Sequence, residues 1–74
     1  MQKESTMKKY THVILDYRVA KLALQFCQVF GAESMELTFS GAHNDFLLSY
    51  KAPVDLNTAV HQFIERTNVV INLI

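Results

Sequence analysis

Cysteine is almost missing from this chain of 74 residues, in which Cys27 stands alone. A single cysteine excludes an internal disulfide, and small secreted domains that lack a large core usually depend on several. We therefore expect a protein of the reducing cytoplasm. Glycine and proline are also scarce, with two and one residues respectively, and the sequence contains no low-complexity segment and no internal repeat.

An excess of charge of either sign is absent too. Seven Lys and Arg residues balance seven Asp and Glu residues, so no long-range field attracts nucleic acid, an anionic membrane or an acidic substrate. No segment approaches the ~20 uncharged apolar residues of a membrane span, and residues 1–9 lack the apolar stretch of a signal peptide. We expect a protein without a membrane partner that chooses its partner by shape.

Hydrophobic residues, in contrast, are plentiful: they make up 50% of the chain, whereas charged residues make up 19%. This composition is unlike that of disordered chains, and the length allows one core only. We expect a flexible tail over residues 1–8 and a single domain over residues 9–74. A domain of this size without disulfides or metal often gains stability by self-association, which makes a homodimer the default expectation.

The first part of the domain is predicted to form a strand and a helix. Residues 9–15 are rich in β-branched and aromatic types, which favours a strand. Asp16 is a good N-cap for a helix over residues 17–30, and Gly31 can take the left-handed conformation that ends a helix. The polar residues of this helix form one solvent-exposed stripe at helical spacing: Arg18, Lys21, Gln25 and Gln28.

A β-hairpin is predicted next. Over residues 35–40, apolar and polar side chains alternate, which is the period of a strand with one dry and one wet face. Turn-forming residues follow at 41–45, and residues 46–51 resume the alternation. The sequence therefore predicts two antiparallel strands joined by a short turn.

The last part is predicted to form a helix and a fourth strand. Pro53 ends the hairpin, and Asp55 is placed to cap a helix whose apolar residues follow helical spacing up to Arg66. Thr67 and Asn68 are poor helix formers, and residues 69–74 are mostly β-branched and apolar. We expect this final segment to enter the sheet.

The order strand, helix, strand, strand, helix, strand resembles the ferredoxin-like fold. This resemblance over residues 9–74 implies an α+β sandwich, a βαββαβ chain with a four-stranded antiparallel-rich sheet and two helices on one face. It is a likeness of topology, and folds of this kind serve many unrelated functions. Function has to be argued from the residues on the open face of the sheet.

That open face is predicted to be unusually apolar. Side chains alternate along a strand, so the neighbours of the core residues must point away from the helices. We expect an interaction face made of Tyr10, His12, Ile14, Leu47, Ser49, Val70, Asn72 and Ile74. A contiguous apolar area often marks a binding surface, so the favoured function is a non-enzymatic protein-interaction or regulatory module. It would form a homodimer or dock on another protein through this face or through an edge strand.

Two other functions remain open. Tyr10 and His12 on the first strand could stack on bases of a single-stranded nucleic acid, although the neutral charge makes nucleic acid a weak expectation. Arg18 and Asn44 resemble the arginine and asparagine pair of acylphosphatases, which would imply a small hydrolase. The glycine-bearing anion loop of those enzymes is missing, since no glycine lies between Lys9 and Phe30.

Metal and cofactor chemistry finds little support in the sequence. A metal site needs about three or four converging ligands, and His12, Cys27, His43 and His61 show no short ligand spacing. Cys27 lies in an apolar helical context, which favours a buried small hydrophobe over a nucleophile. We predict no catalytic residue, no metal and no cofactor.

Overall fold

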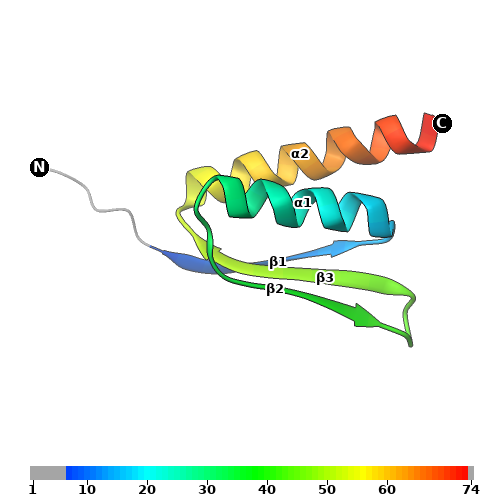
Figure 1. Ribbon diagram of the computed structural model, residues 1–74, viewed down its shortest axis with the longest axis horizontal. Helices are drawn as coiled ribbons and strands as arrows, with labels where there is room; N and C mark the ends of the chain where they lie inside the picture. The colour runs from blue at the N-terminus through cyan, green and yellow to red at the C-terminus, as the bar shows by residue number, and fades with distance from the viewer. Residues whose placement is uncertain (1–6, 74) are drawn as a thin grey trace, which may run out of the picture.

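The sheet of this protein has three strands, and two helices cover one of its faces (Figure 1). The computed structural model describes residues 7–73, and the predicted α+β class with both helices on one side is present there. The five elements follow the chain in the order β1 (Lys8–Ile14), α1 (Tyr17–Val29), β2 (Glu33–Ser40), β3 (Asp45–Ala52) and α2 (Val54–Leu73). Most of the predicted tail over residues 1–8 lies outside the described residues, and β1 begins within it at Lys8.

Helix α1 begins and ends at the predicted signals. The carboxylate of Asp16 accepts a hydrogen bond of 2.8 Å from the backbone N–H of Arg18, which satisfies one of the free amides of the first turn. At the other end, Gly31 has a φ of 84°, a left-handed conformation that costs a glycine nothing. Local backbone chemistry therefore sets where this helix begins and ends.

The strand order is β1-β3-β2, and both pairings are antiparallel. The β2–β3 hairpin turns at residues 41–44, where Asn44 takes a left-handed φ of 56° that asparagine tolerates well. Near the start of β2 the register shifts between Glu33 and Glu36, and Ser34 has a φ of 55°. This β-bulge makes the outer edge of β2 irregular.

The predicted fourth strand is wrong for the residues described. Helix α2 continues through Thr67 and Asn68 to Leu73, and the ferredoxin-like order of four strands is not formed. Val60, Ile64, Thr67 and Ile71 follow one another at helical spacing, and all four are at least half-buried. Burial of this stripe against α1 and the sheet overrides the β-propensity of the last residues.

The start of α2 also differs from the prediction. The helix begins at Val54, and the carbonyl of Pro53 accepts hydrogen bonds from the amides of Leu56 and Asn57 at 3.1 and 3.2 Å. Asp55 therefore lies inside the first turn instead of capping it. Its carboxylate still lies at the positive end of the helix dipole, where a negative charge is favourable.

The core lies between the central strand and the helices. Leu48, Tyr50 and Ala52 of β3 are fully buried, because β3 is covered by helices on one face and flanked by a strand on each side. Helix α1 contributes its small residues Ala20, Ala23 and Cys27, which allow a close approach to the sheet, while the remaining buried side chains are Ile14, Val19, Ala32, Val60 and Ile64.

Strand β1 faces the opposite way from the prediction. Ile14 is buried, Tyr10 and His12 are half-buried, and Val13 is 61% exposed. The register pairs Tyr10 with Tyr50 and His12 with Leu48, and directly opposed residues of neighbouring strands share a face. Tyr10, His12 and Ile14 therefore point toward the helices.

The open face of the sheet is consequently polar. The register places on it Lys9, Thr11, Val13, Glu36, Thr38, Leu47, Ser49 and Lys51. Within this set only Val13 and Leu47 are large and apolar, so the expected broad apolar surface is not formed. Among residues 7–73, neither helix combines the length and the hydropathy that a membrane span requires.

Candidate functional site at the outer edge of strand β1

A chain of hydrogen bonds joins β1, β3 and α2 on the helix side of the sheet. His12 Nε2 lies 2.7 Å from the hydroxyl oxygen of Tyr50, and this hydroxyl donates to Asn57 Oδ1 at 2.9 Å. Tyr50 is fully buried, and a buried hydroxyl without partners would cost about 1–3 kcal/mol. The two bonds satisfy it and hold the outer strand and the second helix to the central strand.

The protons in this chain can be assigned from the donors and acceptors. Tyr50 has one hydroxyl proton and donates it to Asn57, so its oxygen accepts a hydrogen bond from His12 Nε2–H. Burial raises the pKa of Tyr50, which keeps the phenol protonated. Neutral His12 is thereby fixed in the tautomer that carries its proton on Nε2.

A second histidine extends the cluster toward solvent. The ring of His61 on α2 is stacked against that of His12, with centroids 6.1 Å apart. One turn further along α2, Glu65 Oε2 lies 3.0 Å from His61 Nε2, in an exposed pair of a kind that contributes little stability. The cluster therefore extends from the buried phenol of Tyr50 to the exposed carboxylate of Glu65.

The pKa of His12 is lowered by this environment. Partial burial is the largest cause, because it disfavours the charged imidazolium, and the nearby His61 acts in the same direction. The hydrogen-bonding side chain of Asn57 opposes the shift. His12 is therefore a neutral hydrogen-bond donor at neutral pH, and its protonation would place a charge beside the buried Tyr50.

Strand β1, which supplies His12 to this cluster, is an edge strand of the sheet. β1 is at one end of the sheet order, and within residues 7–73 no strand pairs with its outer side. In an antiparallel pair, alternate residues of an end strand direct their backbone N–H and C=O groups away from the neighbouring strand. Strand β1 thus offers a row of hydrogen-bonding groups that another strand could use.

The structure separates the residues of the predicted interaction face. Leu47 and Ser49 lie on the open face, where the Ser49 hydroxyl oxygen is 3.1 Å from that of Thr11. Tyr10, His12 and Ile14 lie on the helix side. The remaining members fall on α2 or beyond it: Val70 and Asn72 are exposed on this helix, and Ile74 lies outside the described residues.

Tyr50, Asn57, His61 and Glu65 belong to the cluster but were not predicted as site residues. The spacing of Asn57, His61 and Glu65, four residues apart on one helix face, was a signal for the part on α2. The sequence contains no such signal for Tyr50, because its place in the alternation of strand β3 predicts only that its side chain is buried. Polar partners of a buried tyrosine become visible once the strand register is known.

The structure also shows where the residues considered for nucleic-acid binding, hydrolysis and thiol chemistry lie. Tyr10 and His12 do not lie on the open face, where stacking on bases was expected. Arg18 is paired with Asp16 at 3.2 Å, and it shares no hydrogen bond with Asn44 in the described part of the chain. Burial raises the pKa of Cys27 to about 11, so this side chain remains a thiol.

Over residues 7–73, no three histidine, cysteine, aspartate or glutamate side chains converge in the manner of metal ligands. Comparison of the chain with protein-family models, with curated proteins and with solved structures finds no match in any of the three.

Substitution of Tyr50 tests the hydrogen-bond chain. Tyr50→Phe keeps the ring but leaves His12 and Asn57 without their partner, so we expect the free energy of unfolding to fall by about 1–3 kcal/mol in urea denaturation. Tyr10→Phe is the matched control on the neighbouring strand and should change it by less than about 0.5 kcal/mol. Equal effects of the two substitutions would contradict the network.

The lowered pKa of His12 predicts a pH dependence of stability. The unfolded chain, in which this histidine has its ordinary pKa of 6.5, takes up a proton at a higher pH than the folded protein. The free energy of unfolding should therefore decrease as the pH falls below about 6.5, and this contribution should be constant above it. His12→Gln should flatten the profile measured by urea denaturation, whereas His43→Gln in the hairpin turn should not. A profile that flattens equally in both variants would refute this assignment.

Proposed function

We propose that this chain is a non-enzymatic protein-interaction domain that self-associates through the outer edge of strand β1. The observation that carries the proposal is the unpaired edge of β1 in a sheet that ends there among the described residues. Pairing with a strand of a second copy would supply partners for the backbone groups of this edge, a common mode of recognition between proteins. The partner is a second copy because the sequence of β1 is compatible with itself in one orientation.

That orientation is antiparallel, with Thr11 on the two-fold axis. Lys8 and Lys9 occupy one end of the strand, and Val13 and Ile14 occupy the other. Antiparallel pairing about Thr11 places each Lys9 opposite Val13 of the second copy, whereas a parallel pairing in register would place each lysine against its own copy. Like charges directly opposite each other are unfavourable, so the lysines select the antiparallel dimer.

The outer edge of β2 is a poorer site for the same pairing. Its register is interrupted between Glu33 and Glu36, and Ser34 takes a left-handed conformation there. A bulge on an edge strand hinders the addition of another strand. Association through β1 alone closes at a two-fold dimer with a continuous six-stranded sheet, instead of growing into a filament.

Two substitutions at position 13 that introduce opposite charges test the proposal. Val13 is on the open face and 61% exposed, so both variants should fold. Val13→Lys would set two symmetric lysine pairs against Lys9, and Val13→Glu would set two attractive pairs there. At about 0.2–1 kcal/mol per pair, the dimer dissociation constants of the two variants should differ by roughly tenfold, the glutamate variant associating more tightly.

Sedimentation equilibrium over a concentration series measures these dissociation constants. Thr38→Lys and Thr38→Glu form the matched control pair on β2, where the side chain is exposed on the same face of the sheet. Neither should move the dissociation constant. The proposed dimer edge would be refuted if the chain remained monomeric at every concentration. It would also be refuted if the substitutions at Thr38, and not those at Val13, changed the dissociation constant.

A further inference from the structure

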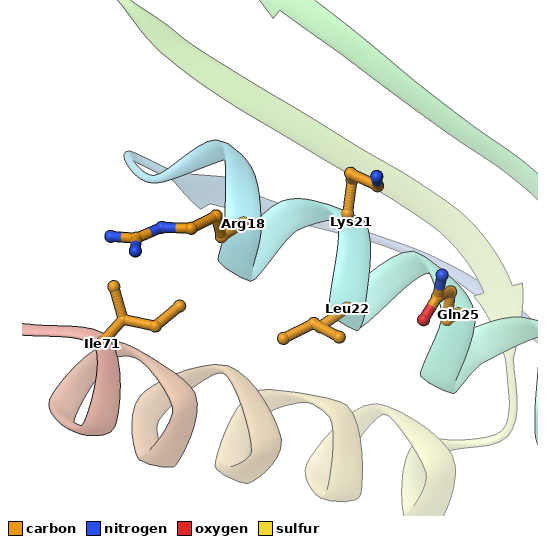
Figure 2. A pocket seen from close by; sticks show the side chains of 5 residues that line it. All are labelled: Arg18, Lys21, Leu22, Gln25 and Ile71. Atoms are coloured by element: carbon orange, nitrogen blue, oxygen red, sulfur yellow. The ribbon is translucent and has the colours of Figure 1, made fainter. Parts of the chain in front are cut away.

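A groove of about 450 Å³ lies between the start of α1 and the last turns of α2, on the helix layer and away from the β1 edge (Figure 2). Leu22 of α1 and Ile71 of α2 project into it, and Leu22 is 42% exposed there. Among the described residues, Arg18, Lys21 and Gln25 form the rest of its lining, all from α1. The groove thus combines an apolar floor with a rim of hydrogen-bond donors and positive charge.

The charges of this rim are not equally available. The Nε and Nη2 groups of Arg18 donate to the Asp16 carboxylate at 3.3 and 3.2 Å, so that carboxylate balances the guanidinium and holds it in place. Lys21 Nζ lies over the Tyr17 ring, 5.6 Å from its centroid, and none of the residues within 7–73 that line the groove is acidic. The uncompensated charge of the groove is therefore the single positive charge of Lys21.

The size of the groove indicates what it can hold. Its volume falls within the ~300–1,000 Å³ of small-molecule sites. The five residues within 7–73 that line it are far fewer than the ~20–30 that each side of a protein interface supplies. A small ligand with an apolar body would cover Leu22 and Ile71. A head group with one negative charge would match Lys21, and the free amide of Gln25 could donate to the same group.

We propose that this groove binds an aliphatic monocarboxylate, with the carboxylate at Lys21 and Gln25 and the chain on Leu22 and Ile71. A phosphate monoester, which carries nearly two charges, fits less well because Asp16 already balances Arg18. The site does not depend on the proposed dimer, since none of its residues lies on β1.

Octanoate is the probe, with octanamide as the neutral analogue of equal chain length and butyrate as the short analogue of equal charge. Titrations of the full chain at low ionic strength, followed by methyl NMR, should show saturable shifts at Leu22 and Ile71. Octanoate should bind roughly fivefold more tightly than octanamide, and a 1 M salt buffer should remove the difference. Butyrate should bind more weakly than octanoate because it buries less apolar area.

Two variants locate the head group. Lys21→Gln should weaken octanoate binding to the level of octanamide, whereas Lys51→Gln, which removes a lysine from the open face of the sheet, should leave it unchanged. The Val13→Lys variant should bind octanoate as the parent chain does, so loss of dimerisation and loss of ligand binding are separable. Equal binding of octanoate and octanamide, equal effects of the two lysine variants, or shifts centred outside the groove would each refute the site.

Discussion

The hydroxyl of Tyr50 is the point at which strand β1 and helix α2 are both joined to the central strand. It lies near the end of the central strand, out of contact with water, and it needs both an acceptor and a donor from neighbouring elements. Asn57 on α2 supplies the acceptor, and His12 on β1 supplies the donor. Because buried polar groups must be satisfied, this requirement fixes which face of β1 meets the helices and where α2 crosses the sheet. The small residues of α1 complete the core on the same face of the sheet.

Local signals in the sequence predicted much of this fold. The Asp16 cap, the Gly31 terminator and the turn before β3 each act through backbone chemistry that neighbouring residues determine, so they survive in the structure. The α+β class and the two helices on one face follow from these signals. The interaction role remains a proposal, and of the two surfaces predicted for it, the open face and an edge strand, it now rests on the edge of β1.

The predictions from the sequence were wrong where tertiary packing decides the local structure. Residues 69–73 have high β-propensity, but Ile71 continues the buried stripe of Val60 and Ile64, so the helix persists. Near its end, strand β1 has apolar residues at both odd-numbered and even-numbered positions. Its sequence alone therefore does not show which of its two faces is buried. The pairing of His12 with Leu48 settles the question, and the apolar face predicted on the opposite side disappears with it. The contact of His12 with Tyr50 depends on that register, so the sequence could indicate only the part of the cluster that lies on α2.

The proposed role follows from one consequence of this packing: because α2 remains helical to Leu73, no segment among residues 7–73 covers the outer edge of β1. NMR of the full chain tests this claim most directly, through the Cα chemical shifts of residues 69–73 and the contacts between their backbone protons and those of Lys8–Ile14. We predict helical shifts at these five residues and no interstrand Hα–Hα contacts to β1. Extended shifts together with such contacts would show a fourth strand on that edge and would contradict the account.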